Sequence, residues 1–176
     1  MKRSFASLHA QEALHVAIFI EERNATVYRQ FAEMFAEFRD PDSLEISAAF
    51  WEMSNEEKHH ATMLQERYFQ GYGTSACAVT EEDISDFIEV PRLEDGRIFS
   101  ADELKSGRSP REMALEVAAS AEQGALRFYQ ELSESCQDKE LRSLYQELVA
   151  FETNHSGWIE QRLWQIRTTA RTKEPS

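Results

Sequence analysis

Two Glu-x-x-His sequences are the chemically most distinctive feature of this chain. They are Glu57-Lys58-His59-His60 and Glu152-Thr153-Asn154-His155. Residues three apart lie on one face of a helix, so each pair can present a carboxylate and an imidazole together. A single glutamate, Glu22 or Glu122, precedes each pair by 30 to 35 residues. Four carboxylates and two imidazoles are the donor set of a carboxylate-bridged two-metal site inside a four-helix bundle.

The rest of the sequence supplies the helices that such a site needs. Helix-period patterns predict four long segments, over residues 8–38, 44–69, 110–136 and 139–167. The first and second segments are separated by only a few residues, as are the third and fourth, which favours antiparallel neighbours. The predicted fold is therefore all-α, a four-helix bundle of two antiparallel helical hairpins, in one domain spanning residues 1–176.

A long crossover over residues 71–108 is expected between the two hairpins. Since structureless loops of that length are uncommon, short helices are expected to start near Thr80 and Ser100. Ser109 and Pro110 predict the capped start of the third long segment. The polar residues 168–176 predict a frayed tail.

Helical-wheel positions test whether the candidate ligands face the core. Glu57 and His60 fall in one stripe with Phe50 and Leu64, and the second pair lies in a similar stripe. An overlapping pair, Glu56-x-x-His59, also fits the spacing, but His59 falls on the opposite side of the wheel and is expected outside. The single glutamates are placed inward. Because all four glutamates lie near the middle of their segments, they are expected to share one level of the bundle.

Buried carboxylates at one level need positive charge, since otherwise they repel one another. Arg67 and Arg111 come nearest to the core stripes, but both lie toward segment ends. Two divalent metal ions would supply four positive charges. The ligand types suit iron, manganese and zinc alike. The predicted metal ligands are Glu22, Glu57, His60, Glu122, Glu152 and His155.

Composition narrows the class of protein. The 176 residues carry a formal net charge of −13, which argues against binding to nucleic acids or anionic membranes. No apolar run approaches the roughly 18 residues that span a bilayer. The two cysteines form no close pair, so neither a disulfide framework nor a zinc knuckle is indicated. We therefore expect a cytoplasmic protein.

These motifs resemble those of the ferritin-like superfamily, and most of all its rubrerythrin and erythrin branch. The similar stretches are Glu22-Arg23-Asn24-Ala25, Glu57 to Ala61, Glu122 to Tyr129 and Glu152 to His155. The resemblance implies two irons bridged by Glu57 and Glu152. It also implies that Glu22 and His60 complete one iron site and that Glu122 and His155 complete the other.

The chain departs from full-length rubrerythrins in two respects. It lacks the two Cys-x-x-Cys pairs of a rubredoxin domain, so a separate electron donor protein or reductase is expected. It also has Ala125 where rubrerythrins usually carry an extra glutamate, one turn after the third-helix ligand. The six-ligand set is similar to that of bacterioferritin-type centres, which weakens the transfer of a peroxidase role.

The expected function is that of a non-haem di-iron oxidoreductase, which couples Fe(II) oxidation to reduction of O2 or H2O2. Iron storage of the ferritin type is one alternative, and it needs a hollow assembly. A di-iron oxygenase acting on an organic substrate is another, and a metal-stabilised structural module is a third. The crossover adds bulk to one side of the bundle, so a monomer or homodimer is expected rather than a shell.

Overall fold

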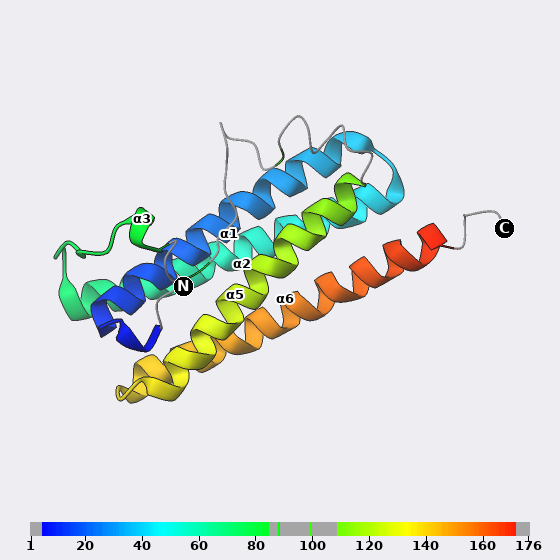
Figure 1. Ribbon diagram of the computed structural model, residues 1–176. Helices are drawn as coiled ribbons and strands as arrows, with labels where there is room; N and C mark the ends of the chain where they lie inside the picture. The colour runs from blue at the N-terminus through cyan, green and yellow to red at the C-terminus, as the bar shows by residue number, and fades with distance from the viewer. Residues whose placement is uncertain (1–4, 85–87, 89–98, 100–108, 172–176) are drawn as a thin grey trace.

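The computed structural model describes residues 5–84, 88, 99 and 109–171, and every regular element among them is helical. Four long helices form a bundle (Figure 1). A short 3-10 helix, η1 (Phe5–Ser7), precedes them, and the small helix α3 (Glu81–Ile84) follows the second. The four long helices are α1 (Ala10–Phe38), α2 (Pro41–Tyr72), α5 (Pro110–Ser135) and α6 (Lys139–Arg171). The predicted all-α four-helix fold is confirmed.

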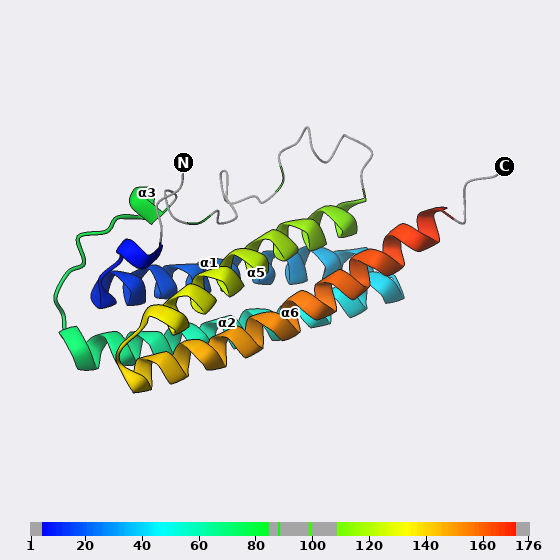
Figure 2. The same cartoon turned by 60° about the horizontal axis from the view of Figure 1, so that its bottom comes forward.

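The bundle consists of two antiparallel hairpins, as the short joints predicted. Helix α1 packs mainly against α2, and α5 packs mainly against α6. Figure 2 shows α1 beside α5 in one layer and α2 beside α6 in the other. The first hairpin turns at Arg39, which has a left-handed backbone with φ of 57°. Serine hydroxyls fasten it further, because Ser47 and Ser54 of α2 donate to α1 carbonyl oxygens at 2.7 and 2.8 Å.

Two helix ends differ from the sequence prediction. Helix α2 begins at Pro41, three residues before the expected start. Asp40 accepts a hydrogen bond from the Ser43 backbone and so caps the helix, and proline is well tolerated in the first helical turn. Helix α6 continues to Arg171, through part of the stretch expected to fray. Arg167, the residue just before this stretch, binds Glu112 and Glu116 of α5, which ties the end of the helix to its neighbour.

Of the crossover, residues 71–84, 88 and 99 are described. Helix α3 starts where Thr80 predicted it, and the Thr80 backbone and hydroxyl both bind the Asp83 carboxylate. The second expected helix, near Ser100, lies outside the described residues. Helix α5 starts at Pro110 as predicted, but the Ser109 side chain makes no capping hydrogen bond.

The apolar core is divided into two halves along the bundle axis. One half lies where α1 begins and contains Leu14, Phe128 and Tyr145. The other lies where α1 ends and contains Phe31, Phe50 and Leu115. The midpoints of the helices, where the candidate ligands lie, fall between these halves. The fold therefore encloses its middle level between two dry apolar layers.

The length and hydropathy that a membrane span requires do not occur together in any helix of the described part of the chain. The single domain over residues 1–176 stays a prediction, as does the oligomeric state.

The serine contacts between α1 and α2 give a test of the first hairpin. Ser54→Ala should lower the free energy of unfolding of the metal-free protein by about 1 kcal/mol relative to Ser143→Ala. Ser54 is buried and donates across the hairpin, whereas Ser143 is an exposed residue of α6. Both substitutions replace a helical serine by alanine and gain the same helix propensity. The difference in unfolding free energy between the two variants, measured by urea denaturation, therefore reports the Ser54 hydrogen bond. Equal stabilities would show that the contact does not hold the hairpin.

Candidate metal centre

Six carboxylate and imidazole side chains converge in the middle of the bundle. They form two groups of four, and within each group the candidate ligand atoms all lie within 4.8 Å of one another. Two glutamates, Glu57 and Glu152, belong to both groups. Among the described residues these two groups are the only sets of three or more such side chains placed to hold a metal ion. The six residues are Glu21, Glu57, His60, Glu122, Glu152 and His155, and all are buried.

The first group combines Glu21, His60 and the two shared glutamates. Nδ1 of His60 lies 3.2 Å from Oε2 of Glu21 and 3.6 Å from Oε2 of Glu57. The ring of His60 rests on the side chain of Phe151 from α6, with ring centroids 4.6 Å apart. An apolar neighbour therefore holds this imidazole in place.

The second group combines Glu122, His155 and the same two shared glutamates. Nδ1 of His155 lies 3.1 Å from Oε1 of Glu57 and 3.5 Å from Oε2 of Glu122. Its other ring nitrogen, Nε2, lies 2.7 Å from Oε2 of Glu56. A carboxylate on Nε2 fixes the proton there and leaves Nδ1 free as a ligand. Glu56 is thus a residue of the centre that was not predicted from the sequence.

The structure corrects one predicted ligand. It brings together Glu57, His60, Glu122, Glu152 and His155, but Glu22 lies on the surface of α1. There Glu22 accepts a hydrogen bond of 2.6 Å from Gln65 of α2. Its neighbour Glu21 is fully buried and takes the predicted place in the first group. Successive residues are separated by about 100° around a helix. Glu22 therefore faces α2 at the surface, whereas Glu21 points into the bundle.

A repeated spacing to tyrosine distinguishes Glu21 from Glu22. Tyr28 lies seven residues after Glu21, and Tyr129 lies seven residues after Glu122. The hydroxyl of Tyr28 donates to Glu122, and that of Tyr129 donates to Glu21. Each tyrosine therefore binds the glutamate of the other hairpin. The two halves of the chain match best when Glu21, rather than Glu22, is aligned with Glu122.

The overlapping pair in α2 was placed correctly by the helical wheel. His59 is exposed, as predicted, and only His60 of the two adjacent histidines is buried. The exposed side of α2 also carries Glu56, which reaches back to His155. The surface glutamate of the overlapping pair therefore supports the centre without being one of its six inner groups.

The centre contains polar atoms whose bonding the protein alone does not complete. Both carboxylate oxygens of Glu57 and of Glu152 are buried without a hydrogen-bond partner among the described residues. The same holds for Oε2 of Glu122 and Nδ1 of His155. Buried polar atoms are normally satisfied, and unsatisfied ones are costly. Since all these atoms face one another and are common metal ligands, the residues present fit bound metal.

In the metal-free protein, burial controls the protonation of the carboxyl groups. Burial raises the pKa of Glu21, and the nearby Glu57 raises it further. Burial also raises the pKa of Glu152, with Glu122 and Glu57 adding to the effect. For Glu57 burial acts in the same direction, but the close polar side chains of Glu21, His155 and His60 lower its pKa well below the usual range. Protonation is thus favoured at Glu21 and Glu152 and disfavoured at Glu57.

The two imidazoles become positively charged next to the carboxylates. Burial lowers the pKa of each histidine, but the effect of the nearby carboxylates outweighs it. Glu21 and Glu57 raise the pKa of His60 to about 9, and Glu122 and Glu57 raise that of His155 to about 11. Both imidazoles are therefore protonated at neutral pH in the absence of metal. Metal ions must displace these protons, because only a neutral imidazole can be a ligand.

Comparisons with known proteins agree with this geometry. The rubrerythrin family model matches residues 12–97, which include three of the six inner residues. No curated protein matches the chain. A solved structure from Thermotoga maritima, assigned to the ferritin-like diiron-carboxylate proteins, superposes with a TM-score of 0.63 at 21% sequence identity. The match covers 89% of this chain and 95% of that one, which extends the shared fold over both hairpins. The part of the chain that holds α1 and α2 is thus similar to the rubrerythrin family, and the helical fold as a whole is similar to that of a solved ferritin-like protein.

Proposed function

We propose that this protein binds two iron ions in the six-residue centre and couples oxidation of Fe(II) to reduction of O2 or H2O2. The observation that carries the proposal is the pair of buried four-residue groups that share Glu57 and Glu152. The rubrerythrin family match and the likeness to a protein described as a diiron-carboxylate protein support iron as the metal. Manganese and zinc suit the same ligand types.

The two shared glutamates are placed to bridge the metal ions. Glu21 and His60 would complete one position, and Glu122 and His155 would complete the other. Iron held in this way supplies one-electron chemistry toward O2 or H2O2. Carboxylates can change how they bind as the charge of the centre changes, because each offers two oxygens.

The surrounding side chains would keep the centre ordered and dry. Tyr28 and Tyr129 hold one oxygen each of Glu122 and Glu21, which leaves the second oxygen of each carboxylate for metal. Glu56 orients His155, and Phe151 packs on His60. The two apolar halves of the core limit entry of water along the bundle axis. These contacts allow a reactive centre to be held without large rearrangement.

The ligand set is tested by comparing two adjacent glutamates. Glu21→Ala should reduce bound Fe(II) from about two ions per chain to about one or fewer, because it removes a buried ligand. Glu22→Ala is the matched control and should keep the full content, since Glu22 is exposed. Metal analysis after anaerobic loading and desalting measures both variants. Equal loss, or loss in Glu22→Ala alone, would contradict the assignment.

Proton release on metal binding gives a second test. Between about pH 6 and pH 8 both imidazoles are protonated in the metal-free protein, because their pKa values lie near 9 and 11. Metal binding must therefore release at least two protons per chain, one from each imidazole. The affinity for Mn(II) should rise with pH. Calorimetry in buffers of different ionisation enthalpy measures the protons released. Binding without release would contradict the proposed roles of His60 and His155.

The redox reaction itself is tested by single-turnover kinetics. Anaerobic protein loaded with about two Fe(II) per chain should be oxidised completely by O2, by H2O2 or by both, and then stop without a reductant. Stopped-flow absorbance separates the two oxidants, and the Glu152→Ala variant should lose the reaction. Persistence of Fe(II) with O2 and also with H2O2 would exclude the proposal. Uptake of iron far beyond the ligand capacity, by a shell-sized particle, would favour storage instead.

A further inference from the structure

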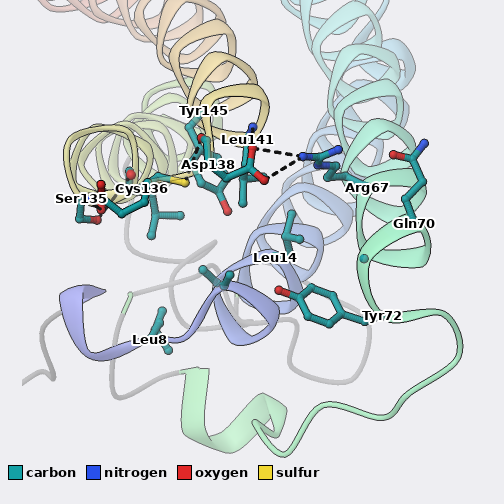
Figure 3. A pocket seen from close by; sticks show the side chains of 15 residues that line it. Leu8, Leu14, Arg67, Gln70, Tyr72, Ser135, Cys136, Asp138, Leu141 and Tyr145 are labelled. Carbon is teal, nitrogen blue, oxygen red and sulfur yellow. Dashed lines mark hydrogen bonds and ion pairs between the residues drawn. The ribbon is translucent and has the colours of Figure 1, made fainter.

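A cavity of about 510 Å³ opens at the end of the bundle, away from the hairpin turn at Arg39. Its wall combines the start of α1, the end of α2 and the connection between α5 and α6 (Figure 3). Leu8, Leu14, Leu132 and Leu141 give the wall a mainly apolar character. Ligand-binding cavities commonly have volumes of roughly 300–1,000 Å³ and an apolar lining with a few polar groups.

The cavity contains one buried polar group with no partner. Tyr145 of α6 lines it and is 1% exposed, and its hydroxyl finds no hydrogen-bond partner among the described residues. Burial raises the pKa of Tyr145, and Cys136, Tyr72 and Asp138 raise it further. The phenol is therefore a protonated donor. A buried hydroxyl without an acceptor is costly, so an occupant that accepts its hydrogen bond would be favoured.

The charged groups of the wall are already paired with each other. Arg67 binds Asp138 at 3.2 Å and Glu140 at 3.0 Å, as the dashed lines to Asp138 show in Figure 3. Asp138 also accepts hydrogen bonds of 2.9 Å from the backbones of Glu140 and Leu141 at the start of α6. No full charge of this group is left over for a ligand, so the cavity is matched to an uncharged molecule.

The cavity is close to the metal centre without being part of it. None of the six inner residues lines the cavity. The ring of Tyr145 stacks on that of Tyr129, with centroids 6.2 Å apart, and the Tyr129 hydroxyl donates to Glu21. A molecule bound to Tyr145 would therefore lie two tyrosine rings away from Glu21, outside direct contact with the centre.

We propose that this cavity is a binding site for a neutral, mainly apolar aromatic molecule with a carbonyl oxygen, such as a quinone or an aromatic ketone. The carbonyl oxygen accepts a hydrogen bond from Tyr145, and the ring packs among Leu14, Leu141 and Tyr72. This site is separate from the proposed iron chemistry, because none of the six inner residues lines it.

The site is tested with duroquinone, a neutral quinone whose four methyl groups block addition of thiols. Calorimetry with metal-free protein should show one bound molecule per chain. Tyr145→Phe keeps the ring and removes only the hydroxyl, so it should weaken binding roughly tenfold while the fold stays stable. Tyr68→Phe is the matched control and should bind normally, since Tyr68 does not line the cavity. Absence of binding to the natural sequence, or equal binding by Tyr145→Phe, would overturn the proposal.

The two cysteines give an independent location for the bound molecule. Cys136 lines the cavity, whereas Cys77 does not, and both are free and partly buried. Saturating duroquinone should slow alkylation of Cys136 by iodoacetamide and leave that of Cys77 unchanged, as measured by mass spectrometry of the peptides. Ala13→Leu, which adds bulk to the cavity wall, should abolish the protection. Equal protection of both cysteines, or of neither, would place the quinone elsewhere and refute this site.

Discussion

Mutual repulsion of four buried carboxylates is the constraint on which the rest of this structure depends. Two unit charges about 4 Å apart repel by about 4 kcal/mol at an effective dielectric constant of 20. Ligand atoms within 4.8 Å of one another therefore cannot all be ionised without compensation. Burial raises the pKa of Glu21 and Glu152, and nearby carboxylates raise the pKa of both imidazoles, so protons are favoured on these four groups when no metal ion is bound. Metal ions would replace those protons, so metal binding would depend on pH.

A site of this kind needs side chains that hold the carboxylates without neutralising them. Two tyrosines do this, and each donates its hydrogen bond to a glutamate of the other hairpin. Tyr28 of α1 binds Glu122 of α5, and Tyr129 of α5 binds Glu21 of α1. A phenol donates a hydrogen bond but carries no charge, so it orients a carboxylate and leaves the negative charge available. Burial raises the pKa of both tyrosines, which keeps them protonated in this role.

The sequence was sufficient for the fold and for most of the centre, because long helices with two Glu-x-x-His pairs allow few arrangements. It was insufficient for Glu21 because α1 is buried over a wide arc, against α2 on one side and α5 on the other. Apolar neighbours such as Leu14 and Ala25 therefore fit an inward position for either Glu21 or Glu22. Glu56 could not be predicted for a different reason. Its side chain is exposed, and its contact with His155 joins two helices that are far apart in the sequence.

The two halves of the chain repeat the Glu-x-x-His pair, but they differ in the residue that precedes it. The residue before each Glu-x-x-His pair contacts the histidine of the other pair: Glu56 binds His155, and Phe151 packs on His60. A carboxylate on the outer nitrogen makes an imidazole a more basic ligand, whereas a phenyl ring only fixes its orientation. The two metal positions therefore have the same inner residue types but different supports. Because Glu56 is also half exposed, the His155 side has a polar connection to solvent that the His60 side lacks among the described contacts. Two irons held here would be chemically inequivalent from the start.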